Sequence, residues 1–518
     1  MDRSVDELWR KAQVCMCAGD RAAARSVLES LLLQAPRHAA AHMTMSHIAW
    51  ADGRVRDAAR HALDTARDFS ADDPMAIIAL SMALLRAGET VAARECLEHP
   101  VLAHARSGQV VMCHAGLRRE LGEDARALRL FDRAHALGVE GAEFRFARGL
   151  EHVICDHARE AESDFEASLR MDPRSGAATL ELARLRVQTP ERNHLEELER
   201  RRSRVLPGSV DRAALEFARY KELEDIGRYE EAWAALSAGN GIMRALHSYD
   251  PLRTRRQVDA LIATLSQRVP EPDAASKEEG PRPIFILGLP RSGTTLLDRL
   301  LGSHSQVVSA GELEDFSRQM CWAADQPEPL GDPMLQALTK LDYREIGHRY
   351  LAQTQWRAGA ARFFIDKQPW HYMLAGLIRL ALPGARLLHL VRDPMDVCFS
   401  NYRALLGGKY GYSFDLHALP GHFLEYRRLM SATHAASPGT ILDVSYNELV
   451  TATEATMRKV LSFCGLKWEP ACLDPSRNTT AVATLSAMQA RGPVHAGASG
   501  AWRPYRRHLE ELRQQLPA

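Results

Sequence analysis

A chain of 518 residues exceeds what one hydrophobic core usually serves, so the sequence predicts at least two domains. Its 66 basic and 66 acidic side chains leave no net charge, so neither nucleic acid nor a membrane surface is an expected partner. The first residues lack an apolar signal core, and no apolar run is long enough to span a bilayer. The scattered cysteines are expected to be reduced, buried thiols, which favours a cytoplasmic protein. The nine cysteines form no C-x-x-C pair, and we therefore expect no metal site.

Residues 1–250 show a helical period of 34 or 35 residues. A glycine can end one helix in a left-handed cap, and an alanine five positions later lets the next helix approach closely. This pattern resembles the tetratricopeptide repeat family, which implies an all-α solenoid with a concave face. A protein or peptide, a second copy of the chain, or only the rest of this chain could occupy that face. The repeated positions are Gly19, Gly53, Gly88, Gly122 and Asp156, followed by Ala24, Ala58, Ala93, Ala127 and Ala161.

Residues 251–282 are predicted to form a connecting helix and a linker rich in proline, charge and small side chains. Beyond them, residues 283–518 alternate strand-like and helical runs. This alternation predicts a P-loop-like, three-layer α/β domain whose parallel sheet binds ligands at the carboxyl ends of its strands. The strand-like runs are "PIFILGL", "ARFFIDKQP", "ARLLHLVRDP" and "TILDVSYNELV".

The segment "FILGLPRSGTTLLDRLL" contains a strand, a glycine-rich turn and a helix start. Gly288 and Gly293 have the spacing of a phosphate-binding loop, but Thr294 occupies the position of the lysine that serves nucleoside triphosphates. Backbone N–H groups, hydroxyls and the positive end of a helix suit a phosphate or a sulfate. The candidate contacts are Arg291, Ser292, Gly293, Thr294 and Thr295.

A second segment, "LLHLVRDPMDVCFSNYR", places Arg392 after an apolar strand and Ser400 on the expected next helix. Such a pair can hold a second phosphate. Together the two segments resemble the cofactor signatures of sulfotransferases that use 3′-phosphoadenosine 5′-phosphosulfate (PAPS). The arginine before Ser-Gly-Thr-Thr is the form found in the tyrosylprotein sulfotransferase branch and its bacterial relatives, many of which carry tetratricopeptide repeats. The resemblance covers residues 283–505.

The resemblance implies roles for several side chains in sulfuryl transfer. Glu312 in "SAGELEDF" is the candidate general base, with Glu314 as the fallback. Lys367 in "FFIDKQPWH" would contact the transferring sulfonate, and it would pair with Asp366 if that residue faced the site. Ser486 matches a serine that helps the transition state. The candidate catalytic residues are Glu312, Arg291, Lys367 and Ser486.

The resemblance also implies a donor pocket. Tyr446 would pack near the adenine, while Arg491 and Trp502 would border the 3′-phosphate. Relatives usually carry a basic residue directly before the tryptophan, but this chain has Ala501, and Arg503 follows instead. Loss of a buried charged phosphate contact would cost about 1.5–3 kcal/mol of donor affinity.

Three functions remain open from the sequence. The first is a sulfotransferase that moves the sulfuryl group from PAPS to an acceptor hydroxyl by in-line displacement without a metal. The second is a P-loop kinase or NTPase, which the missing loop lysine opposes. The third is a repeat scaffold with a catalytically degenerate domain, favoured only by Ala501. We expect the first, with a protein tyrosine, a glycan, a lipid or a small molecule as the acceptor.

Overall fold

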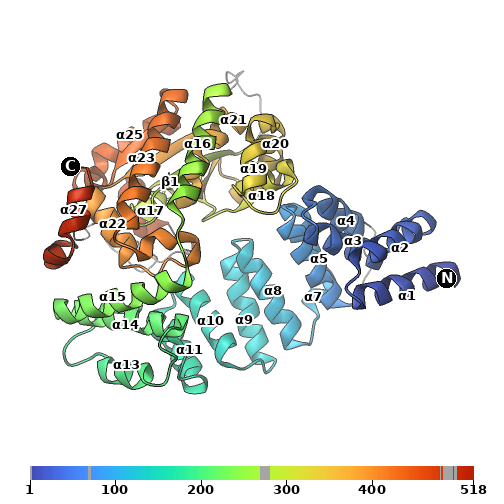
Figure 1. The fold of residues 1–518 in the computed structure, drawn as a ribbon, viewed down its shortest axis with the longest axis horizontal. Helices are drawn as coiled ribbons and strands as arrows, with labels where there is room; N and C mark the ends of the chain where they lie inside the picture. Colours follow the sequence, from blue (N-terminus) through green and yellow to red (C-terminus); the bar gives the residue numbers. More distant parts are fainter. Residues whose placement is uncertain are drawn as a thin grey trace. The chain divides into compact units, whose positions relative to one another are not determined.

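The computed structural model describes residues 3–67, 72–268, 280–478, 480–481, 494, 497 and 499–517. The chain divides into two compact units, and each combines segments that lie far apart in the sequence. The first comprises Met1–Val139, Glu314–Trp356 and Leu380–Leu382, and the second Glu140–Leu313, Arg357–Arg379 and Pro383–Ala518. The domain limits expected from the sequence stay a prediction, because each unit contains residues from both halves. Figure 1 colours the chain from blue to red along its length.

Helical hairpins build the part of the first unit that precedes residue 140. The predicted period is confirmed, since the four glycines adopt φ between 76° and 84° and Asp156 at the next step has φ 69°. All five predicted alanines are buried, and each belongs to the helix that follows its turn. The hairpins pair α1 with α2, α3 with α4, α5 with α6 and α8 with α9. Their bounds are α1 (Arg3–Cys17), α2 (Arg21–Gln34), α3 (Ala39–Ala51), α4 (Val55–Arg67), α5 (Pro74–Arg86), α6 (Thr90–Cys96), α7 (Pro100–Ala103), α8 (Gly108–Glu120) and α9 (Asp124–Ala136).

A segment from the second half of the chain packs on these hairpins inside the first unit. Helix α18 (Asp315–Ala324) contacts α4, and α20 (Tyr343–Thr354) contacts α6; α19 (Asp332–Ala337) lies between them in the sequence. The Thr90 hydroxyl donates to Asp315 Oδ1 at 2.7 Å, and Gln319 Nε2 donates to the Gly88 carbonyl at 2.8 Å. The early repeats therefore hold part of their own chain.

The later repeats belong to the second unit. Helix α10 pairs with α11, α14 packs against both α12 and α15, and α16 lies along α23. Among the described residues, no helix is long and apolar enough to cross a membrane. The bounds are α10 (Ala142–Ile154), α11 (Ala158–Met171), α12 (Gly176–Arg184), α13 (Leu195–Arg202), α14 (Val210–Asp225), α15 (Tyr229–Leu246), α16 (Pro251–Gln267) and α23 (Ala418–Ala436).

A five-stranded parallel sheet of order β2-β3-β1-β4-β5 forms the centre of the second unit, which confirms the predicted α/β class. Strand β1 lies between β3 and β4, with Ile286 opposite Lys367 and Gly288 opposite Leu390. The carboxyl ends of these three strands therefore meet at one edge. The strands are β1 (Arg282–Gly288), β2 (Val307–Ser309), β3 (Phe363–Lys367), β4 (Arg386–Val391) and β5 (Ile441–Ser445).

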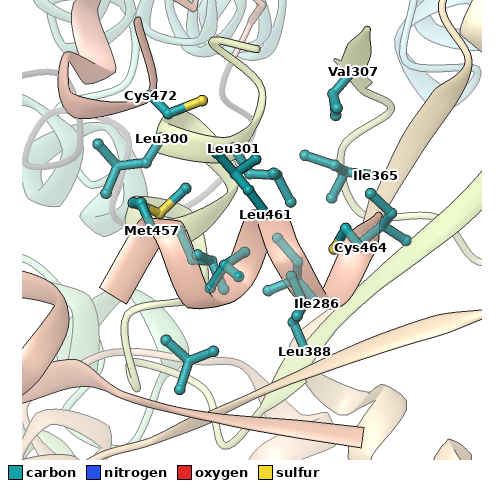
Figure 2. Close-up of a cluster of buried hydrophobic side chains, with 14 of the residues drawn as sticks. Ile286, Leu300, Leu301, Val307, Ile365, Leu388, Met457, Leu461, Cys464 and Cys472 are labelled. Carbon is teal, nitrogen blue, oxygen red and sulfur yellow. The ribbon is translucent and has the colours of Figure 1, made fainter. Parts of the chain in front are cut away.

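Helices cover both faces of the sheet. On one face, aliphatic side chains of the strands pack against α17 (Thr294–Leu301) and α25 (Thr453–Cys464) in the core drawn in Figure 2. Ile286, Leu300 and Leu461 are 0–1% exposed there. On the other face, the imidazole of His389 contacts Tyr426 of α23. Four more α-helices lie in the described part of residues 283–518: α21 (Ala375–Ala381), α22 (Pro394–Tyr402), α24 (Tyr446–Thr451) and α27 (Glu510–Gln515).

Candidate active site

The glycine-rich loop between β1 and α17 is held by the second motif. Gly288 ends the strand at φ 151°, Arg291 adopts φ 67°, and Gly293 caps α17 at φ 110°. Arg392 Nη1 donates to the carbonyl of Arg291 at 2.9 Å, and Asn401 Nδ2 donates to that of Pro290 at 2.7 Å. These two hydrogen bonds fix the conformation of the loop before any ligand binds.

Tyr446 closes over the loop where β5 leads into α24. A β-carbon at Gly293 would lie 2.4 Å from Tyr446 Cδ2, so only glycine fits beneath the ring. The guanidinium carbon of Arg392 stands 4.5 Å from the centre of the same ring, a cation–π distance. The loop, Arg392 and Tyr446 thus form one packed group at the strand ends.

Hydroxyl groups of the loop lie inside the protein. Ser292, Thr294 and Thr295 are 1%, 3% and 5% exposed. Among the described residues, Ser292 Oγ has no hydrogen-bond partner. A buried hydroxyl without a partner costs free energy unless something else bonds to it. The loop therefore offers a polar group that an anionic ligand could engage.

Arg291 lies in a surplus of positive charge. Burial, together with the cationic Arg403, Arg184 and Arg392, lowers the pKa of Arg291 to about 9. Arg184 ends α12 and Arg403 is paired with Glu224 of α14, so the later repeats contribute to this field. Cations gathered at a phosphate-type loop favour a bound anion, which would reverse the depression of the Arg291 pKa.

Glu312 and Lys367 form an ion pair beside the loop. Lys367 Nζ lies 2.5 Å from Glu312 Oε1, and the lysine side chain is 2% exposed while the carboxylate side chain is 33% exposed. The backbone N–H of Lys367 donates to the carbonyl of Gly311 at 2.9 Å. This bond extends the pairing between β2 and β3 up to the turn that carries Glu312. A carboxylate that is one third exposed is thereby placed next to a buried ammonium.

Asp366 lies away from Lys367, although the sequence left a pairing of the two open. Adjacent side chains of a strand point to opposite faces of the sheet. Asp366 Oδ1 stands 3.6 Å from His371 Nδ1, and both side chains are fully buried. Burial lowers the pKa of His371 to about 3, so this imidazole is neutral at pH 7. Asp366 therefore does not compete for the Lys367 ammonium.

A cavity of about 380 Å³ opens next to Tyr446 and Arg392. Its floor is fixed by Asp396, whose Oδ1 accepts from the Gly500 N–H at 2.7 Å. Arg503 packs on Gly500, since a β-carbon there would lie 2.9 Å from Arg503 Nε. The lining residues are Arg392, Asp393, Asp396, Tyr446, Asn447, Ser499, Gly500, Trp502 and Arg503.

The residue beside Trp502 that lines this cavity is Arg503, and Ala501 is not among its described lining residues. Ser400 is 7% exposed on α22 and does not occur in that lining either. Glu314 is the residue preceding α18 in the first unit. Ser486 and Arg491 lie outside the described residues. The site assignments therefore stay predictions, although most of their side chains gather at one edge of the sheet.

Sequence reasoning missed the residues that support the site. Asn401 holds the loop, Asp396 holds Gly500, and Asp393 caps α22 by accepting from the Asp396 N–H at 2.9 Å. The Asp-Pro pair at the start of the helix was a visible capping signal for Asp393. Asn401 and Asp396 gave no local signal, because their partners lie about a hundred residues away.

Residues 283–470 match the model of the Sulfotransferase family. An uncharacterised protein of Aquifex aeolicus is 31% identical over 309 residues, which cover 58% of this chain and 40% of that protein. That share of this chain exceeds the part after residue 282, so the match reaches into the helical half. Protein-tyrosine sulfotransferase 2 of Gallus gallus is 23% identical over 207 residues, covering 37% of this chain and 53% of that protein.

Among solved structures, the sulfotransferase domain from the Synechococcus PCC 7002 olefin synthase is 22% identical, with a TM-score of 0.32 over 46% of this chain and 91% of that one. The chain spans about half, or less, of the length of the two sequence relatives described above.

Proposed function

We propose that the chain transfers the sulfuryl group of PAPS to an acceptor hydroxyl, because residues 283–470 match the model of the Sulfotransferase family. The observation that carries the proposal is the shared position of Arg392 and Tyr446. Both pack against the phosphate-type loop, and both line the adjoining cavity of about 380 Å³. The donor has a phosphosulfate at one end and a 3′-phosphate at the other, so it needs two linked anion sites of this kind.

The residues present fit the donor. The buried Ser292 hydroxyl and the N-terminus of α17 would hold the phosphosulfate, with Arg291 as the counter-charge. Arg392 and Arg503 would hold the 3′-phosphate from the cavity walls. Arg503 would then supply the charge that Ala501 lacks, which removes the main argument for a degenerate domain.

The chemistry proposed is an in-line displacement at sulfur. The acceptor O–H gives its proton to Glu312, the acceptor oxygen forms a bond to sulfur, and the bond from sulfur to the bridging oxygen breaks. Adenosine 3′,5′-bisphosphate leaves with the electron pair of that bond. Lys367 stabilises the negative charge that develops near the sulfonate, and its buried position strengthens this effect.

We extend the proposal to a tyrosine hydroxyl as acceptor and to a cytoplasmic location. The tyrosine rests on the name of the Gallus gallus relative. The location rests on the nine cysteines, all of which are free thiols, as is usual in the cytosol. Among the described residues of the site, Thr294 stands where a kinase or NTPase loop carries its lysine, and Asp366 at the end of β3 is buried against His371, so neither residue favours a kinase.

Calorimetric titration with adenosine 3′,5′-bisphosphate, set against ATP with magnesium, tests the donor class. We expect the bisphosphate to bind and ATP to bind at least tenfold more weakly, and Arg392→Ala to remove the preference. Transfer of label from PAPS carrying a radioactive sulfonate to a tyrosine-containing peptide then tests the reaction. Preference for ATP, or bisphosphate binding without transfer to any tyrosine, glycan or phenol acceptor, would contradict the proposal.

A further inference from the structure

Two histidines and an aspartate converge on the sheet face opposite the core of Figure 2. His389 of β4 and Asp443 of β5 are paired in register, and His434 comes from the last turn of α23. Asp443 Oδ1 lies 2.7 Å from His389 Nδ1 and 2.9 Å from His434 Nε2. The three ligand atoms all lie within 4.8 Å of one another. Three separate elements thus direct metal-binding atoms to one point.

We propose that His389, His434 and Asp443 bind a divalent transition metal, with Zn²⁺ as the ion their chemistry fits best. Two imidazole nitrogens and one carboxylate oxygen form a common three-residue zinc ligand set, and water takes the fourth position. Imidazole also disfavours Mg²⁺ and Ca²⁺, which prefer oxygen ligands. The site is separate from the proposed sulfuryl-transfer site and does not depend on that function.

The ring of His389 is oriented by a second contact, as the rings of metal-bound histidines usually are. Its Nε2 is hydrogen-bonded to the hydroxyl of Tyr426, and the two rings meet edge to face at 5.6 Å. Tyr426 is 6% exposed and cannot easily turn away. This contact directs His389 Nδ1 toward Asp443.

The other two ligands are placed so that an ion can enter. The side chains of His434 and Asp443 are 33% and 53% exposed, whereas that of His389 is 6% exposed. Around a tetrahedral zinc ion, ligand atoms stand ~3.4 Å apart. The present separations are hydrogen-bond distances, so binding needs the carboxylate and His434 to open by about half an ångström, given those metal–ligand lengths. Two partly exposed side chains can make this movement without disturbing the sheet.

A second group in the first unit, formed by His42, His61 and Asp64, is a poorer ligand set. Arg60 Nη2 lies 3.4 Å from His61 Nε2, and a guanidinium at that distance repels a metal cation. This group therefore serves as an internal control in the experiment.

The experiment uses the full, untagged chain after treatment with a chelator and its removal. Titration with Zn²⁺ against a chromophoric competitor is expected to show one ion per chain with micromolar or tighter affinity. His434→Gln and Asp443→Asn should each weaken binding at least tenfold. His61→Gln should leave it unchanged, and so should His417→Gln, which alters a 65% exposed side chain.

X-ray absorption of the loaded wild-type protein gives a readout that does not depend on the folding of any variant. We expect two imidazole ligands and oxygen neighbours around zinc. If the chain does not bind one zinc ion, the three residues form only a hydrogen-bonded network, and the proposal is overturned. Binding that survives both His434→Gln and Asp443→Asn, or that is lost in His61→Gln, would overturn it as well.

Discussion

At the scale of single residues, Glu312 and Lys367 supply each other's counter-charge in an ion pair, and we proposed that both act in transfer. Glu312→Gln removes the proposed proton acceptor, and we expect transfer to fall by a factor of at least about 10². Binding of adenosine 3′,5′-bisphosphate should persist, since the loop and the cavity are untouched. Glu314→Gln is the matched control and should keep most of the activity. If Glu314→Gln abolishes transfer and Glu312→Gln does not, the assignment of the base is wrong.

The glycine beneath Tyr446 offers a test of loop geometry. Gly293→Ala would place a methyl group 2.4 Å from the ring at φ 110°, so we expect Tyr446 to be displaced and bisphosphate binding to weaken by tenfold or more. Gly439→Ala is the control, because it has φ 73° with no described atom within 4 Å of the added carbon. It should lose about 1 kcal/mol of stability from backbone strain and no affinity.

Titration calorimetry and urea unfolding of the two glycine variants separate the effects. Tyr446→Ala added to Gly293→Ala removes the clash but keeps the strained φ. If the double variant unfolds at the same urea concentration as Gly293→Ala, backbone strain and not the clash with the ring explains the loss of stability in Gly293→Ala.

At this scale the sequence predicted the loop glycines, Arg392 and Tyr446, because each belongs to a short motif with a known spacing. It did not predict that Asp366 would lie against His371. The alternation of side chains along β3 would have placed Asp366 and Lys367 on opposite faces, but it could not say which face carries the ligand.

At the scale of elements, a buried polar contact fastens α18 to repeat helix α6. Asp315 is 2% exposed and accepts from the Thr90 hydroxyl at 2.7 Å. Thr90→Ala should cost about 1–3 kcal/mol of unfolding free energy, because a buried carboxylate loses the hydrogen bond from the Thr90 hydroxyl. Thr90→Ser keeps the hydroxyl and should restore most of that loss. Equal urea midpoints for the alanine variant and the wild type would show that the contact contributes nothing.

A buried carboxyl in helix α9 predicts that the stability of the protein depends on pH. Burial raises the pKa of Asp124, in the first turn, to about 6. The folded chain therefore holds this proton more tightly than the unfolded one. The associated stability is present below pH ~4 and is lost as the pH rises through 6. Asp124→Asn should stabilise the protein by on the order of 2 kcal/mol at pH 7 and much less at pH 4.

Thermal or urea unfolding at the two pH values checks the Asp124 prediction. Asp6→Asn, on an exposed turn of α1, is the control and should show no comparable difference between them. A stabilisation by Asp124→Asn that is equal at both pH values would show that ionisation of this carboxyl is not the cause.

At the scale of the whole molecule, the last repeats are built into the unit that carries the sheet. Glu224 of α14 accepts from the hydroxyls of Tyr220 and Tyr505, and Arg403 donates to both of its oxygens at 3.3 Å. Asn240 Nδ2 of α15 donates to the carbonyl of Tyr402 at 3.0 Å. Helices that the sequence assigned to a separate domain thus support the residues next to the site.

A chain that begins at residue 251 should therefore not fold like the full protein. It would leave the largely covered Arg403 without its carboxylate partner and Tyr505 without its packing against Trp233. We expect poor solubility or a broad, weakly cooperative thermal transition. If the shortened chain melts as sharply as the full one and binds the bisphosphate equally well, the limit near residue 250 is a true domain boundary.

The sequence predicted the two architectures because each leaves a local trace. The 34-residue period is visible in the recurring glycines and alanines, and buried parallel strands appear as runs of apolar residues. It could not predict that residues 314–356 pack on the early repeats. Thr90 and Asp315 are 225 positions apart, and contacts of that kind have no signature in either segment.

The path of the backbone at Leu313 has a consequence for the proposed reaction. The chain leaves the second unit there and enters the first at Glu314, two residues after the proposed base. Helix α18, which begins at once, is clamped to the repeats through Asp315 and Gln319. A substitution in the repeats that displaced Asp315 would act on Glu312 through the short stretch of backbone between them, so the proposed base should respond to changes made far from it in the sequence.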